Sequence, residues 1–140
     1  MLTGKPFDLE IITPERIAFE GKVESVTVPG AYRPFQILFN HAPIIAELEV
    51  GQLRFNDSSD KHSLYATGGG FVQVLNNKVS IVVESAEDSH DINVDRALEA
   101  KKRAEERLRN RDEIDYHRAK FALVRAMNRL KTAHYTENQH

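Results

Sequence analysis

Apolar and polar residues alternate over short segments in the first 84 residues. Residues 7–12 and 22–28 show this pattern, and Pro14 and the pair Pro29 with Gly30 interrupt it. Further short segments bounded by turn-forming or polar residues are residues 35–39, 43–50, 51–55, 62–66, 71–74 and 79–83, which we also expect to be strands. A period of two is typical of strands with one buried face. Eight or more short strands, with turns between them, predict a β-sandwich or barrel.

Residues 85–140 contain no glycine or proline, and their apolar residues recur at helical spacing. Asn93 or Asp95 can cap a first helix built from strong helix formers over residues 97–108. We expect a break at residues 110–112, with Asp112 as the next cap. The seam of the first helix would hold Ala97, Ala100 or Lys101, Ala104 and Leu108. That of the second would hold Ala119, Ala122, Leu123, Ala126, Met127 and Leu130.

The sequence therefore predicts an α+β protein in two parts. Residues 1–86 would form a β-sandwich or barrel of about 8–10 short strands. Residues 87–140 would form an antiparallel helical hairpin, because two helices joined by a short polar connection pack in this way. Alanine seams bury little apolar surface, so the hairpin would grip the β-domain weakly. Such a pair is either a movable element or an ordinary peripheral helix pair.

Charge and composition exclude several functional classes. The 140 residues carry 19 Lys and Arg against 21 Asp and Glu, a net charge of -2, which gives no overall attraction to nucleic acid. There is no cysteine for a disulfide or a thiolate metal site. No apolar run approaches the roughly 20 residues of a membrane helix, and the N-terminus lacks the apolar stretch of a secretory signal.

Candidate chemistry is sparse. The triplet at residues 68–70 lacks the spacing of a phosphate-binding loop, so we expect a close backbone approach or a bulge there. His41 has no second ligand or nucleophile at a useful spacing. No catalytic motif and no metal-binding motif is present, which predicts that the chain is not an enzyme in its own right.

Six segments, in order, resemble the epsilon subunit of the F-type ATP synthase over nearly the whole chain. They are residues 9–16 (LEIITPER), 21–30 (GKVESVTVPG), 40–46 (NHAPIIA), 48–54 (LEVGQLR), 69–74 with 77–79 (GGFVQV, NKV), and 95–97 with 100–108 (DRA, AKKRAEERL). One loop departs from the family pattern Gly-x-Phe-Gly-Ile-Leu, because Arg33 and Gln36 replace two usual glycines. A backbone conformation with positive φ is therefore in doubt at these two positions.

The resemblance implies a non-catalytic rotor subunit that couples gamma to the c-ring. It implies that His41, Ala42 and Pro43 lie in a loop that contacts the c-ring or gamma. The helical tail would fold down on the β-domain or extend along gamma to the catalytic alpha/beta head, where it would restrain ATP hydrolysis. The chain would contact the membrane only through the complex, on its cytoplasmic face or the stromal or matrix equivalent. It would bind no nucleic acid and require no cofactor.

Some family members bind ATP on the folded tail through the motif Ile-Asp-x-x-Arg-Ala, which reads INVDRA at residues 92–97 here. By resemblance, ATP would be a weak regulatory ligand of Glu87, Asn93, Arg96, Arg103, Arg125 and Arg129. Asn93 or Asp95 would otherwise serve only as a helix cap. Two alternatives to the rotor subunit remain: a stand-alone β-sandwich adaptor, and a nucleotide-sensing module.

Overall fold

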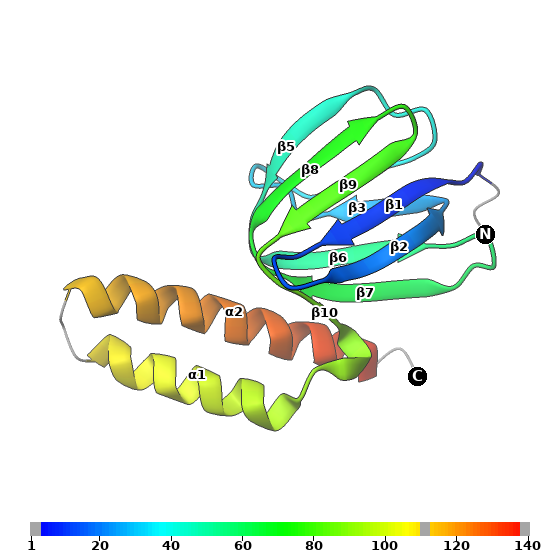
Figure 1. The fold of residues 1–140 in the computed structure, drawn as a ribbon. Coiled ribbons are helices and arrows are strands. Elements are labelled where there is room, and N and C mark those ends of the chain that lie inside the picture. Colours follow the sequence, from blue (N-terminus) through cyan, green and yellow to red (C-terminus); the bar gives the residue numbers. More distant parts are fainter. Residues whose placement is uncertain (1–3, 110–112, 138–140) are drawn as a thin grey trace. The chain divides into compact units, whose positions relative to one another are not determined.

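The computed structural model describes residues 4–109 and 113–137, and the chain divides into two compact units, the first ending at Asp88 and the second beginning at Ser89. The first unit holds ten strands (Figure 1). They are β1 (Phe7–Ile12), β2 (Ile17–Val23), β3 (Ser25–Val28), β4 (Phe35–Ile37), β5 (Ile44–Leu48), β6 (Gly51–Asn56), β7 (His62–Thr67), β8 (Gly70–Leu75), β9 (Lys78–Val83) and β10 (Ala86–Asp88). The second unit holds a short 3-10 helix, η1 (Ser89–Asp91), followed by α1 (Val94–Arg109) and α2 (Glu113–Glu137).

The strands form two five-stranded sheets, which confirms the predicted β-sandwich. One sheet has the order β2-β1-β9-β8-β5 and the other β10-β7-β6-β3-β4. β1 and β9 run parallel, and the other paired strands run antiparallel. Alternate residues of both sheets fill one core, in which Leu9, Ile37 and Leu53 are fully or almost fully buried. Burial of such side chains contributes about 1.5–3 kcal/mol each to stability, so the sandwich has a firm core.

The prediction of a single strand at residues 22–28 is wrong, because two strands share this range. The chain leaves β2 at Val23 and enters β3, in the opposite sheet, at Ser25. Glu24 lies between them, and its backbone N–H donates to the Asn56 carbonyl at 2.8 Å. Val23 and Val26 are both buried although they are three residues apart, because the crossing at Glu24 shifts the alternation by one residue. The sequence pattern also missed the start of β2 at Ile17.

The last strand, β10, extends the second sheet beyond the expected end of the β-domain at residue 86. Ala86, Glu87 and Asp88 pair with Thr67, Ala66 and Tyr65 of β7. Arg16, in the turn between β1 and β2, donates from Nη2 to the Ala86 carbonyl at 3.0 Å. The first unit therefore runs through Asp88, two residues further than the pattern of turn-forming residues indicated.

Gly70 allows a close backbone approach, as the triplet at residues 68–70 predicted. A Cβ atom at Gly70 would lie 1.9 Å from the Val82 carbonyl oxygen and 2.8 Å from the Val83 Cα, distances that no side chain can occupy. Gly70 pairs with Val83 in the β8–β9 ladder, so the missing side chain lets the two strands meet there. None of the glycines among residues 4–109 and 113–137 has a positive φ. Space, and not a left-handed conformation, therefore requires Gly70.

The β8–β9 hairpin turns through Asn76 and Asn77, whose φ angles are 50° and 59°. Two consecutive residues with positive φ form the type I′ turn that suits the twist of an antiparallel hairpin. The predicted hairpin is confirmed. Arg33, in the loop before β4, and Gln36, on β4 itself, are not among the positive-φ residues of the described chain. This segment therefore does not use the left-handed conformations that glycines would allow.

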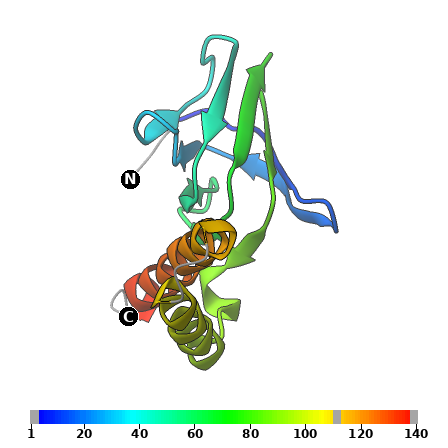
Figure 2. The same cartoon turned by 90° about the vertical axis from the view of Figure 1, so that its left-hand side faces the viewer.

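The second unit is the predicted helical hairpin, and Figures 1 and 2 show α1 and α2 side by side and antiparallel. Buried alanines recur every seven residues on both helices, at Ala97 and Ala104 and at Ala119, Ala126 and Ala133. Seven residues is the spacing of positions that face a partner helix in a coiled coil. Met127, expected on this seam, is 51% exposed, because it lies about 100° around the helix from Ala126. The expected break and the Asp112 cap lie outside the described residues.

Candidate functional site

The loop that holds His41, Ala42 and Pro43 connects β4 to β5 at one end of the first sheet. It opens with a turn in which the His41 N–H donates to the Leu38 carbonyl at 3.2 Å, with Asn40 at a φ of 62°. Positive φ at the third residue is what a type II turn requires, and asparagine tolerates it. The His41 side chain is half-buried and donates from Nδ1 to the Ala42 carbonyl at 2.7 Å. Ala42 and Pro43 are exposed.

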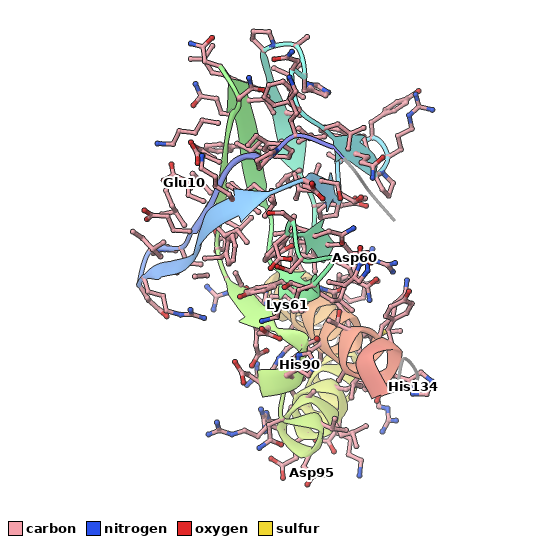
Figure 3. The ribbon with its side chains drawn as sticks, turned by 90° about the vertical axis from the view of Figure 1, so that its right-hand side faces the viewer. Glu10, Asp60, Lys61, His90, Asp95 and His134 are labelled. Atoms are coloured by element: carbon pink, nitrogen blue, oxygen red, sulfur yellow. The ribbon has the colours of Figure 1, made fainter. Side chains whose placement is uncertain are left out.

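The outward face of the first sheet carries charged side chains on β1 and a mixture of apolar and polar side chains on β8 and β5. On β1, Glu10 accepts from the Ser80 hydroxyl at 2.8 Å and lies 3.7 Å from the Lys78 Nζ (Figure 3). On β8 and β5, beyond β9, three apolar residues of this face are exposed: Ile45 by 76%, Phe71 by 53% and Leu75 by 46%. The polar Glu47 and Gln73 alternate with them on the same face. A shallow groove lined by Pro43, Ile44, Ile45, Gln73, Val74 and Leu75 runs beside the loop. Exposed apolar side chains gathered on one face are typical of a protein contact surface.

The strand pattern along the sequence did not predict this patch. The sequence does contain a signal for it, because apolar residues stand next to each other in two of these strands. Ile44 is followed by Ile45, and Phe71 precedes the buried Val72. Strands covered on both faces lose the apolar–polar alternation, so adjacent apolar residues indicate a second contact. Ile45 and Phe71 are exposed and take no part in the described core.

In the helical unit, Asn93 caps α1. Its Oδ1 accepts from the Arg96 N–H at 3.1 Å, and its carbonyl accepts from the Ala97 N–H at 3.0 Å. Asp95 lies in the first helical turn (Figure 3), where its charge is favourable toward the helix dipole. The capping alternative for Asn93 is therefore confirmed. Glu87 lies on β10, in the first unit, whereas the four arginines belong to the second unit.

The four predicted arginines of the helical unit lie beside the alanine seam. Arg96, Arg103 and Arg125 each precede a buried seam alanine, and Arg129 follows Ala126 by three residues. In an antiparallel hairpin the residues just before the seam on each helix lie along the same edge of the pair. Arg96, Arg103 and Arg125 are exposed, and Arg129 is half-buried. Several guanidinium groups on one edge suit an anionic ligand. Nucleotide binding by these residues stays a prediction.

Both units match known sequence profiles. The beta-sandwich domain of the ATP synthase Delta/Epsilon chain matches residues 6–89, and the long alpha-helix domain of the same chain matches residues 90–134. The chain belongs to the ATP synthase delta/epsilon chain family.

Relatives in the ATP synthase delta/epsilon chain family match along most of their length. The ATP synthase epsilon chain of Desulfitobacterium hafniense (strain Y51) is 42% identical over 127 residues, which are 91% of this chain and 96% of the relative. The ATP synthase epsilon chain of Natranaerobius thermophilus is 40% identical over 139 residues, 98% of this chain and 99% of the relative. The resemblance read from the six sequence segments is therefore confirmed.

Two solved structures share the delta/epsilon fold. A chain in the cryo-EM structure of the Euglena gracilis mitochondrial ATP synthase, OSCP/F1/c-ring, matches with a TM-score of 0.80 and 18% identity, over 100% of this chain and 87% of that one. A chain in the cryo-EM structure of the Tetrahymena thermophila mitochondrial ATP synthase central stalk and c-ring matches with a TM-score of 0.63 and 13% identity. The match covers 94% of this chain and 99% of that one. At these identities the likeness concerns the fold alone.

Neither α1 nor α2, over their described residues, has a stretch long and apolar enough to span a membrane.

Proposed function

We propose that this chain is a non-catalytic rotor subunit in the central stalk of an F-type ATP synthase, where it couples gamma to the c-ring. The observation that carries the proposal is the match of both family domains in order, with epsilon chains of about the same length at 42% and 40% identity. On this view ATP is made and hydrolysed on other subunits. The chain meets the membrane only through the complex, on the cytoplasmic face or its stromal or matrix equivalent.

Two surfaces of the first unit support the coupling role. The exposed Ile45, Phe71 and Leu75 form a patch with Glu47 and Gln73 between them. Such a mixed patch suits a protein partner, which we assign to gamma. The loop at His41, Ala42 and Pro43 borders this patch and suits contact with the c-ring or gamma. Because torque must pass through both contacts, a sandwich whose core residues are fully buried is an appropriate scaffold.

Replacement of His41 by alanine is expected to weaken assembly more than folding. The substitution removes the side chain that holds the loop carbonyl of Ala42, while the β-sandwich core contains no part of His41. We expect the affinity for a synthase depleted of this chain to fall roughly fivefold or more, as for a central interface residue. His62→Ala is the matched control, since His62 is an exposed histidine on the other sheet. Equal losses of affinity and of unfolding free energy in His41→Ala would indicate a structural role instead.

A second, regulatory function is favoured by the arginines beside the alanine seam. We propose that they bind the phosphates of ATP weakly, so that nucleotide stabilises the folded hairpin. Removing one charge-assisted hydrogen bond costs about 1.5–3 kcal/mol, so Arg103→Ala or Arg125→Ala should weaken ATP binding roughly tenfold or more. Lys102→Ala, with its side chain on the far face of α1, should leave it unchanged. Calorimetric titration of the isolated chain measures this, and equal binding by all three variants would exclude the arginine site.

A further inference from the structure

Asn40 and Asn77 form a reciprocal pair of hydrogen bonds between two loops that are 37 residues apart in sequence. The backbone N–H of Asn40 donates to Oδ1 of Asn77 at 2.7 Å, and Nδ2 of Asn77 donates to Oδ1 of Asn40 at 3.0 Å. A backbone N–H can only donate, so the Asn77 atom that faces it is the amide oxygen, and the Asn77 amide nitrogen is then left to face Asn40. The backbone N–H of Asn40 thus fixes the orientation of the Asn77 side-chain amide. In that orientation the Asn77 Nδ2 donor faces the Asn40 Oδ1 acceptor.

This asparagine clamp joins the β4–β5 loop to the turn of the β8–β9 hairpin. Asn40 and Asn77 both have positive φ, which glycine would adopt more readily, so backbone conformation alone does not require two asparagines. Asn76 has a φ of 50° and takes no part in the clamp. The side chain at position 77 therefore does something beyond making the turn, and the turn provides its own matched control at position 76.

Packing against the core anchors the two ends of the loop. Phe39 packs against the core, and the Lys5 Nζ lies 5.5 Å from the centre of its ring. At the far end, Ile44 begins β5 and packs against the core. Between these anchors, the clamp ties the exposed turn to the turn of the β8–β9 hairpin. It also brings together the two walls of the shallow groove, Pro43 from the loop side and Leu75 from the hairpin side.

We propose that Asn77 is a positioning residue, which through Asn40 holds the loop of His41, Ala42 and Pro43 in the shape that meets its rotor partner. The inference rests on the proposed contact of this loop. A loop that is already ordered loses less conformational entropy on binding, so its partner binds more tightly without any direct contact to Asn77. Because both hydrogen bonds are between neutral groups, the effect is insensitive to salt, unlike contacts between exposed charges.

The first measurement is amide hydrogen exchange by NMR on the isolated full chain, for Asn77→Gly, Asn76→Gly and Asn40→Asp. Glycine keeps the positive φ, so Asn77→Gly removes the clamp alone, and Asn76→Gly makes the same change one residue away. Exchange of the Asn40 amide should quicken roughly three- to tenfold in Asn77→Gly, the equivalent of one net hydrogen bond. It should be unchanged in Asn76→Gly, and in Asn40→Asp, whose carboxylate still accepts from Asn77. Unchanged exchange in Asn77→Gly would overturn the clamp.

The second measurement is the affinity of the same variants for a synthase depleted of this chain, at low and high salt, beside His41→Ala. We expect Asn77→Gly to bind roughly three- to tenfold more weakly at both salt concentrations, and Asn40→Asp, which keeps the acceptor for Asn77, to bind as the unaltered chain does. Normal affinity of Asn77→Gly, when His41→Ala binds weakly, would overturn the positioning role and leave the loop contact standing. Normal affinity of both variants would instead overturn the loop contact, and the role of the clamp in it.

Discussion

Deletion of residues 112–140 is expected to raise ATP hydrolysis by the assembled synthase roughly fivefold or more, the lower end of a typical coupling between sites, while ATP synthesis remains largely intact. The deletion removes α2, which is half of the helical hairpin, and leaves all ten strands in place. If the tail reaches the catalytic head and restrains hydrolysis there, its loss releases that restraint. Steady-state ATPase assays on complexes reconstituted with full-length and shortened chain provide the comparison.

The physical basis of this expectation is the thin seam between the helices. It is lined by alanines such as Ala104 and Ala126, whose methyl groups bury little area, so separating the helices costs little apolar contact. The exposed basic residues of α2, Arg118, Lys120 and Arg125 among them, can then pair with acidic groups of a partner. Each exposed pair contributes only about 0–1 kcal/mol, so several must act together.

Salt provides the control for the tail prediction. Higher ionic strength should raise hydrolysis by the full-length complex in the same direction as the deletion but less strongly, because screening weakens contacts between exposed charges. The complex with the shortened chain should respond less. An unchanged hydrolysis rate after deletion, with normal assembly, would mean that the tail is no brake in this protein.

Gly70→Ala is expected to destabilise the β-sandwich by about 3 kcal/mol, at the upper end of typical overpacking costs. The new Cβ would meet the Val82 carbonyl oxygen at 1.9 Å, and because the obstacle is backbone, the β8–β9 ladder must itself move apart. Gly69→Ala is the matched control. Its Cβ meets the nearest atom, the Leu48 carbonyl oxygen, at 3.4 Å, so its effect should stay within about 1 kcal/mol. Urea unfolding followed by tyrosine fluorescence tests this, and equal midpoints for the two variants would contradict the close approach at Gly70.

The sequence pattern predicted the elements more reliably than their limits. Alternation identified strands such as β1 and β6 because each buries one face over its whole length. It failed at Glu24, where the chain changes sheets and the buried phase shifts, and at β10, whose three residues are too few for a period to show. The helical seam was predicted in outline, but Met127 was placed on it because a helix with mixed apolar residues does not reveal which ones face the partner.

In the candidate site, contacts between residues close in sequence could be predicted from residue type, whereas contacts between distant residues could not. The cap at Asn93 follows from local chemistry and was open to prediction, since an asparagine side chain bonds to N–H groups within a few residues. The Asn40–Asn77 clamp joins residues 37 positions apart and depends on the register that places the β8–β9 turn beside the β4–β5 loop. No local pattern encodes that register, so this pair could be found only in the folded structure.

The central claim, that this chain is a subunit of an F-type ATP synthase, is tested most directly by affinity capture. The chain would be tagged, expressed in the cells from which it comes, and captured after gentle detergent extraction of their membranes. Mass spectrometry should then identify the alpha, beta, gamma and c subunits of the synthase, and the captured material should hydrolyse ATP. Capture of the intact, folded chain without those subunits and without ATPase activity would contradict the account and favour a stand-alone adaptor.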